Sequence, residues 1–419
     1  MKNRKLISAA MAVALATTLA ACGGNTGGTD TNSNAPAGTL EVFLNMPAGS
    51  PQEGVMRELV SEFEEAENVD VSVTVGPSGY SEDMRVKIAS NSLPDVFATH
   101  GWSVMRYSPY LLPLDDQPWV ENVHPGLKDI VFDDEGHIYT LPLEYAISGL
   151  AMNFDVLDQA GVDPSSLDSW DGVEAAMAKV KEAGISPITS SAQENAGDVG
   201  NYIASGQFTE SEQQRFADEE FDTGLWVERV AGKLETWTKA GYFNPDFVSA
   251  KQDDMARQLA DGSAAFAFAF PFVLATANEY NPDANLGFMP IPGQEQNYLV
   301  GGEGVQSYGV AKDSDMQAEA LAFLNHLAQP ENAIRLVESM NAYSGLTTVN
   351  ADLGSLQSSF DEWVTPGEYP TRPFFDRVYL PSGMWSTLVS TSDGIINGQL
   401  TAADAAEQMK QQYDTLKAE

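Results

Sequence analysis

The chain has 419 residues, of which 60 are acidic and 22 basic, giving a formal net charge of −38 at pH 7. Such an acidic surface repels nucleic acid and does not steer anionic ligands toward the protein, so neither kind of partner is expected. The hydrophobic share of 43% is that of a packed protein, and the length exceeds a usual domain of roughly 100–200 residues, so we expect two domains. A single cysteine allows no internal disulfide, so stability must come from core packing.

The N-terminus has the composition of an export signal. Lys2, Arg4 and Lys5 precede an uncharged, largely apolar run over residues 6–21 that ends in small residues. This run is shorter than the ~20 residues that span a bilayer. We therefore expect residues 1–21 to be a signal peptide.

The cysteine follows this run in Leu19-Ala20-Ala21-Cys22, which resembles the lipobox of bacterial lipoproteins. The resemblance implies that the sulfur of Cys22 carries a diacylglyceryl group, with palmitate among its acyl chains, and that two or more chains anchor the protein stably. An ordinary secretory signal with a chance cysteine is the alternative. A catalytic thiol is disfavoured because its Gly-rich flank cannot hold a nucleophile beside a base. Residues 22–38 are then the lipidated Cys and a flexible tether.

Strand and helix patterns alternate at the start of the globular part. Residues 39–46 and 94–98 have the composition of strands, and residues 69–75 alternate valine with polar residues, as a half-buried strand does. Residues 53–63 and 81–90 show helical spacing of apolar residues. This order predicts an α/β fold with a largely parallel sheet, whose ligands gather at the carboxyl ends of the strands.

The middle and the end of the chain are mostly helical. Ser169 is a plausible N-cap for a helix that runs to Ala183, where Gly184 fits the C-terminal stop. Further helices are expected over residues 226–237, 318–327, 331–340 and 402–416, and residues 264–270 alternate Ala and Phe.

Several stretches together resemble the extracellular solute-binding proteins of ATP-binding-cassette importers, in the branch that takes carbohydrates. These stretches follow the lipobox, occur in the same order as in that family and together cover most of residues 40–416. The stretches are FEEAENVDVSVTV, NSLPDVFATH, GHIYTLPLEYAISGLAMNFDVLDQAGVDPSSLDSWDGV, FAFPFVL, GFMPIPG, GGEG, AEALAFLNHLAQPENA and YLPSGMW.

The chain departs from the family pattern at four positions. Asn153 follows Met152 where the family usually has Tyr before Asn, and Ser169 replaces Thr. Gly172 takes the place of the capping Glu, so the capping box is lost. Phe272 stands where Trp is common, and a phenyl ring can still stack on a sugar.

The resemblance implies a two-lobed periplasmic-binding-protein-like fold of type II, in which each lobe is a mostly parallel sheet flanked by helices. A hinge of three crossing segments joins the lobes, and the ligand binds in the cleft between them. The N-terminal lobe is expected at 39–147 plus 294–340, the C-terminal lobe at 148–292 plus 342–419, and the crossings near 148–152, 290–293 and 341–347.

A sugar has apolar faces that stack on aromatic rings and a rim of hydroxyls that need donors and acceptors. Candidates are therefore aromatic and polar residues at the ends of loops. Trp385 is the leading stacking candidate, whereas Trp226 and Trp237 lie at helical spacing typical of a core. The predicted ligand-binding residues are Trp102, Tyr145, Gln193, Asn195, Phe270, Phe272, Gly302, Glu303 and Trp385.

We expect a monomeric binding lipoprotein on the extracytoplasmic face of the cell membrane, which delivers a carbohydrate to permease subunits and has no catalytic residue, cofactor or metal. The same fold could instead bind a peptide, polyamine or polyol. A surface glycoside-active enzyme is the third alternative, because a glycosidase needs only two carboxylates across a cleft and the chain is rich in them. The scattered histidines, by contrast, lack the clustering of a zinc site.

Overall fold

The protein is described by a computed structural model that covers residues 38–46, 48–76, 80–99, 101, 103–192, 194–218, 220–340 and 342–418. The predicted signal peptide, Cys22 and nearly all of the predicted tether lie outside these residues, as do Trp102 and Gln193.

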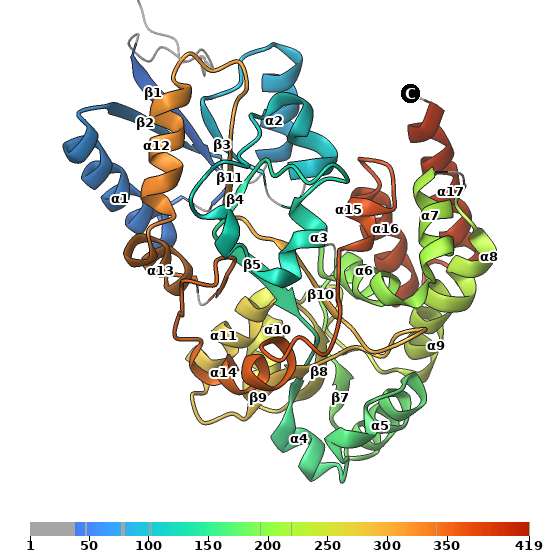
Figure 1. The fold of residues 1–419 in the computed structure, drawn as a ribbon. Helices are drawn as coiled ribbons and strands as arrows, with labels where there is room; N and C mark the ends of the chain where they lie inside the picture. The colour runs from blue at the N-terminus through green and yellow to red at the C-terminus, as the bar shows by residue number, and fades with distance from the viewer. Residues whose placement is uncertain are drawn as a thin grey trace, which may run out of the picture. The chain divides into compact units, whose positions relative to one another are not determined.

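The first sheet contains the strands expected near the N-terminus. Its order is β2 (Asp70–Val75), β1 (Thr39–Leu44), β3 (Val96–Ala98), β11 (Ser307–Val310) and β4 (Leu141–Pro142). Helices α1 (Pro51–Glu67), α12 (Gln317–Leu327) and α13 (Pro330–Glu338) pack together beside it (Figure 1). The helix between β2 and β3 is α2 (Tyr80–Ala89). The strand–helix–strand order predicted over residues 39–98 is thus confirmed.

Local chemistry explains where α1 begins and ends. The Ser50 hydroxyl accepts a hydrogen bond from the Glu53 backbone N–H at 3.3 Å, and Pro51 occupies the first helical position, where no intrahelical N–H bond is lost. The helix stops at Asn68, whose φ of 56° is left-handed. Its buried residues Met56, Leu59, Val60 and Phe63 recur at three- and four-residue spacing.

The second sheet has the order β7 (Ser186–Ile188), β8 (Ala264–Phe268), β6 (Leu150–Asn153) and β9 (Leu286–Met289). The Ala/Phe alternation of β8 sorts its side chains between the two faces of the sheet. Phe266 and Phe268 pack into one apolar cluster, while Ala267 and Ala269 pack into another. Both faces of this sheet are therefore covered.

Helices surround this sheet and complete the fold. Next to it in the chain lie α4 (Phe154–Gln159), α5 (Trp170–Glu182), α10 (Gln252–Ala260) and α11 (Pro271–Tyr280). A group formed by α6 (Glu194–Gln207), α7 (Glu210–Asp218), α8 (Thr223–Trp226), α9 (Gly232–Ala240), α16 (Trp385–Ile396) and α17 (Ala402–Ala418) lies together in Figure 1. The short helices are α3 (Lys128–Val131), α14 (Gln357–Ser359) and α15 (Phe375–Val378).

The expectation of mostly parallel sheets is wrong in detail. β1 is parallel to β2 and β3, but β11 is antiparallel to β3 and β4. In the second sheet the neighbours β7 and β8 are parallel, whereas β6 is antiparallel to both of its neighbours, β8 and β9. The connections account for the parallel part: α1 and α2 cross over between β1, β2 and β3 and return the chain in the same direction. β11 has no such crossover before it, because the chain enters it directly from a strand of another sheet.

A third sheet, called the middle sheet below, has the order β12 (Tyr343–Ser344), β5 (Glu144–Ser148), β10 (Leu299–Glu303) and β13 (Thr371–Arg372). β5 ends at Ser148 and β6 begins at Leu150, so Gly149 alone separates strands of two different sheets. A Cβ atom on Gly149 would lie well inside the van der Waals radius of the Met289 carbonyl oxygen. Only glycine fits where the chain passes from one sheet to the next.

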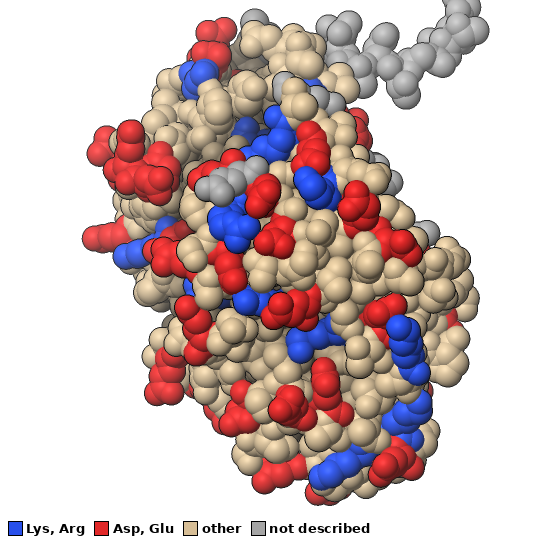
Figure 2. Space-filling model, turned by 90° about the vertical axis from the view of Figure 1, so that its right-hand side faces the viewer, with Lys and Arg blue, Asp and Glu red and all other residues tan. Residues whose placement is uncertain are grey.

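The surface is acidic, as the composition requires. Figure 2 shows Asp and Glu side chains spread over the upper and lower parts of the face that it presents. Among the described residues, no helix is long and apolar enough to cross a bilayer.

We predict that Gly149→Ala lowers the free energy of unfolding by about 1–3 kcal/mol, because the added methyl overpacks a contact with backbone that cannot move aside easily. Urea denaturation followed by circular dichroism measures this change. Gly54→Ala is the matched control, since Gly54 lies within α1 with nothing within 4 Å of an added Cβ. That variant should be neutral or more stable by about 0.5–1 kcal/mol. Equal stability of both variants would contradict a tight passage at Gly149.

Candidate functional site

The first half of α6 carries a row of buried polar side chains. Asn195, Asp198 and Asn201 follow at three-residue spacing on one face of the helix, and all three are buried. The Ser191 hydroxyl donates to Asn195 Oδ1 at 2.6 Å, and Asn195 Nδ2 donates to Asp198 Oδ2 at 3.4 Å. A polar helix face that is turned inward needs such partners, because an unpaired buried polar group is costly.

The same face of α6 holds the short helix α15 in place. Asn201 Nδ2 donates to Asp376 Oδ1 at 2.6 Å, and the Asp376 backbone N–H donates to Asn201 Oδ1 at 3.1 Å. This pair of bonds fixes the asparagine amide and the carboxylate in one orientation. Burial raises the pKa of Asp376 above its ordinary value, although the neighbouring Arg377 charge works in the other direction.

Aromatic rings form a wall next to this polar row. Phe270 lies edge-on to Tyr202 of α6 with ring centroids 6.0 Å apart, and its centroid is 5.3 Å from that of Phe374. Phe272 stacks on Phe270 at 5.9 Å with an angle of 12° between the rings, and it is 42% exposed. Gly302 of β10 is buried against the ring of Phe374. The wall thus ends in an exposed aromatic ring at Phe272.

Trp385 lies beside the first turn of α6. It begins α16 and is partly exposed, and a Cβ added to Gly197 of α6 would come within 3.0 Å of the edge of its indole. The absence of a side chain at Gly197 therefore lets the indole rest against the α6 backbone, between Asn195 and Asp198 in sequence. The indole of Trp385 therefore lies close to the part of α6 that carries the Asn195 amide and the Asp198 carboxylate.

Arg377 adds a positive charge to this region. Its guanidinium carbon lies 4.3 Å from the centroid of the Phe374 ring, and the group reaches the backbone of Gly101. The carboxylates of Asp376, Glu303 and Asp198 all act on it electrostatically. Arginine stays protonated in proteins, so Arg377 is a permanent cation that faces several carboxylates.

Glu303 is bonded within the protein. Its carboxylate accepts hydrogen bonds from the Ser103 backbone N–H at 2.8 Å and from the Thr99 hydroxyl at 3.2 Å, and the side chain is buried. Burial raises the pKa of Glu303 above its ordinary value, against the effect of these hydrogen bonds. Glu303 thereby connects β10 to the chain that follows β3.

The predicted site residues therefore separate into three groups. Asn195, Phe270, Phe272, Gly302, Glu303 and Trp385 are linked through shared neighbours on α6, α15 and β10. Tyr145 is paired with Glu303 across β5 and β10, but its side chain is enclosed by the protein: its hydroxyl is 2.5 Å from Thr371 Oγ1 and its ring contacts those of His124 and Tyr343. Trp102 and Gln193 lie outside the described residues.

Six residues of this region were not predicted from the sequence. They lie on two elements, α6 and the segment around α15, and they are Asp198, Asn201, Tyr202, Phe374, Asp376 and Arg377. The three-residue spacing of Asn195, Asp198 and Asn201 is a signal in the sequence, but such a pattern normally marks a solvated helix face.

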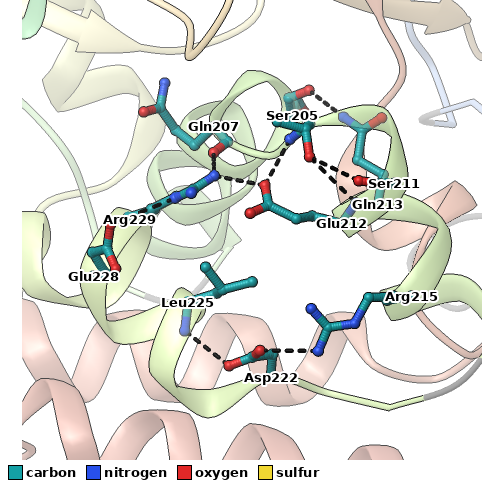
Figure 3. A network of polar contacts seen from close by, with 11 residues as sticks. Ser205, Gln207, Ser211, Glu212, Gln213, Arg215, Asp222, Leu225, Glu228 and Arg229 are labelled. Carbon is teal, nitrogen blue, oxygen red and sulfur yellow. Dashed lines mark hydrogen bonds and ion pairs between the residues drawn. The ribbon is translucent and has the colours of Figure 1, made fainter.

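A charged network fixes the far end of α6 (Figure 3). Arg229 Nη1 donates to the Gln207 carbonyl at 2.9 Å and pairs with Glu212 Oε2 at 2.6 Å. Gln207 Nε2 in turn donates to the Pro292 carbonyl at 2.7 Å. The guanidinium thus satisfies a carbonyl at the C-terminus of the helix, where a cation also complements the helix dipole.

We predict that Arg229→Met lowers the free energy of unfolding by about 2 kcal/mol, because the Gln207 carbonyl loses this donor and the Glu212 carboxylate loses its cationic partner. The side chains of this pair are only 16% and 18% exposed. Lys239→Met is the control: Lys239 is 71% exposed and pairs with Glu235 one turn away, so a change of about 0.5 kcal/mol or less is expected.

The loss of stability caused by Arg229→Met should become smaller at low pH. Burial opposes ionisation of Glu212, but hydrogen bonds from Thr209 and the Arg229 charge together lower its pKa below the ordinary 4.5. A lowered pKa contributes stability above pH 4.5 that is lost as the pH falls through the folded-state value. The difference between wild type and Arg229→Met, measured by urea titration, should therefore shrink below pH 4.5. A difference that does not change with pH would contradict the role of this pair.

The comparisons with known proteins agree with this architecture. Residues 48–334, more than half of the chain, match the bacterial extracellular solute-binding proteins. The chain belongs to this family. The melibiose/raffinose/stachyose-binding protein MelE of Bacillus subtilis is 28% identical over an alignment of 407 residues that covers 90% of each chain.

Two solved structures of binding and transport proteins are similar to this chain over almost its whole length. The binding protein MsmE of Bacillus subtilis, in an open conformation, has a TM-score of 0.82 at 26% identity and covers 91% of this chain and 98% of its own. A sugar transporter protein of Bacillus licheniformis in complex with stachyose has a TM-score of 0.77 at 27% identity, with coverage of 90% and 100%. The two-lobed α/β fold is thereby confirmed. The family match also confirms the expectation that the chain is a solute-binding protein of an importer and not an enzyme.

Proposed function

We propose that this protein captures an oligosaccharide of the melibiose, raffinose and stachyose series and delivers it to the permease of an ATP-binding-cassette importer. The observation that carries the proposal is the pairing of an exposed aromatic surface, at Phe272 and Trp385, with the amide and carboxylate row of α6. The relative MelE is named for these three sugars, and a similar structure holds stachyose.

The chemistry of the site suits such a ligand. The apolar faces of sugar rings stack on aromatic side chains, and Phe272 and Trp385 are among the partly exposed rings of this region. Sugar hydroxyls both donate and accept, and Asn195 and Asp198 offer both functions from one helix. Since these polar groups are already held by Ser191 and by each other, little side-chain freedom is lost when a ligand binds.

The remaining predicted residues take different roles in this proposal. Trp102 and Gln193 adjoin the site in sequence, next to Ser103 and to the start of α6, and are proposed as further ligand contacts. Gly302 and Glu303 shape the site by packing against Phe374 and bonding to Ser103. Tyr145 is proposed to stabilise the middle sheet near the hinge, because its hydroxyl and ring are occupied by protein neighbours.

The protein would act as a two-state hinge without bond chemistry. The lobes are proposed at residues 39–147 plus 294–340 and 148–292 plus 342–419, with the ligand between them. A ligand favours the closed form only as far as it binds that form better than the open one. A lipid on Cys22 would keep the monomer at the outer surface of the membrane, close to its permease.

We expect raffinose or stachyose to raise the thermal midpoint of the protein carrying Cys22→Ser, which lacks the lipid acceptor. Ligand at 100 times its dissociation constant adds ~2.7 kcal/mol to native stability. Differential scanning fluorimetry with melibiose, raffinose, stachyose, a polyol, a short peptide and spermidine makes the test, and chromatography should show the sugar unchanged. A response to the peptide or spermidine alone would keep the fold and refute the oligosaccharide.

We predict that Trp385→Ala weakens binding of the best sugar by about 1 kcal/mol, roughly fivefold in Kd, because a stacking surface is lost. Isothermal titration calorimetry measures the change. Trp170→Ala is the matched control, since Trp170 is also partly exposed and packs against the same apolar cluster, but stands at the start of α5. Both variants should lose stability, and only Trp385→Ala should lose affinity. Wild-type affinity in a folded Trp385→Ala protein would remove this residue from the site.

A further inference from the structure

Arg377 contacts two segments that are far apart in the sequence. Within its own segment, the guanidinium stacks on the Phe374 ring, 4.3 Å from guanidinium carbon to ring centroid. On its other side lies Gly101, which follows β3 of the first sheet. A Cβ atom on Gly101 would collide with the Arg377 Nη1 atom, and the φ of Gly101 is +76°. Both the space taken by the guanidinium and the backbone conformation therefore favour glycine at this position.

The carboxylates around Arg377 come from four different elements. Asp376 belongs to α15, Asp198 to α6, Glu303 to β10 and Glu144 to β5, and each of them interacts electrostatically with Arg377. Burial raises the pKa values of Asp376, Glu303 and Glu144 above their ordinary values, and the Arg377 charge works against this rise in each case. Without the arginine, these carboxylates would repel one another or take up protons.

A second arginine makes a parallel connection between the same two parts of the chain. Arg106 lies in the helical turn Ser103–Tyr107, and its Nη2 atom donates to the Ser382 hydroxyl just before α16. It also acts electrostatically on Asp376. The Ser103 backbone N–H, at the start of the same turn, is bonded to Glu303 at 2.8 Å. The chain after β3 is thus joined to the segment that carries Phe374 and Trp385.

We infer that Arg377 is a positioning residue that latches the chain after β3, at Gly101 and Ser103–Tyr107, onto α15 in the ligand-binding arrangement. This inference rests on the proposed function. In it, Arg377 touches no ligand. It strengthens binding because its charge offsets carboxylates from several elements that meet in this arrangement, and Arg106 assists through Ser382. Opening of the lobes would separate these groups and release the latch.

The test compares Arg377→Ala with Arg257→Ala in the full chain carrying Cys22→Ser. Arg257 is an exposed arginine that pairs with Asp253 one turn away and stacks on Tyr280, so its removal should leave affinity unchanged. Arg377→Ala should weaken binding of stachyose by at least about tenfold, the scale of a truncated buried charge partner. Arg106→Ala should weaken it in the same direction, and it keeps the inference testable where Arg377→Ala does not fold.

Two further readouts separate a latch from a general loss of packing. Adding Glu303→Gln to Arg377→Ala should restore part of the lost affinity, because it removes one of the repelling charges. Spin labels on Val86→Cys and Val248→Cys, 66% and 73% exposed and placed beside the first and second sheets, report the separation of the lobes. At saturating stachyose, Arg377→Ala should retain a larger fraction of long distances than wild type.

Wild-type affinity and wild-type distances in Arg377→Ala would overturn the latch. So would a loss of affinity that Glu303→Gln leaves unchanged. If the parent protein binds no oligosaccharide at all, the proposed function fails instead. The label distances of the unliganded protein then decide the latch by themselves: longer distances in Arg377→Ala than in the parent support it, and equal distances refute it.

Discussion

The close approach of α6 and α16 is the contact on which the candidate site depends. Two glycines of α6 make it possible: a Cβ on Gly197 would lie 2.7 Å from Val389 Cγ2, and one on Gly200 would lie 2.8 Å from Ser392 Oγ. With the two backbones so near, the start of α16 brings Trp385 to the first turn of α6. The spacing of the helices, rather than any single side chain, sets the distance between the stacking ring and the polar row.

This arrangement carries an energetic cost that the neighbouring elements offset. Asp198 and Asn201 face inward, where unpaired polar groups destabilise a protein by about 1–3 kcal/mol each. Asn195, Asp376 and the Arg377 charge provide the partners, and the network at Gln207 and Arg229 holds the other end of the helix. A polar row in a packed interior is expected where function requires it, since an apolar face would stabilise the fold more simply.

Periodicity predicted the local structure well because it reports what each segment does with its own side chains. The valine alternation of β2 and the apolar spacing of α1 decide strand and helix without reference to the rest of the chain. Strand direction was less predictable, because the antiparallel pairing of β11 with β3 joins residues about two hundred positions apart. A pattern within one segment carries no information about that partner.

The candidate site was predictable to the extent that it lies at strand ends. Phe270 and Phe272 follow from that rule. Trp385, which begins α16, follows instead from the resemblance to the family. Tyr145 satisfies the same rule, yet its ring is enclosed by His124 and Tyr343, which reach it from distant parts of the chain. Asp198 and Asn201 escaped prediction for the opposite reason, since polar spacing on a helix ordinarily indicates solvent. Only tertiary packing distinguishes these cases.

The charge of the protein acts at two separate levels. Most of the 60 acidic residues contribute to a field at the surface, which salt screens over about 8 Å at physiological ionic strength. Arg229 and Arg377 act inside, at distances where screening is weak, and each serves carboxylates that burial would otherwise drive toward protonation. In a chain with 22 basic residues, a buried arginine therefore has consequences that the net charge does not express. The acidic surface and the neutral ligand proposed for this protein are compatible, because the net charge neither attracts nor repels a ligand that carries no charge.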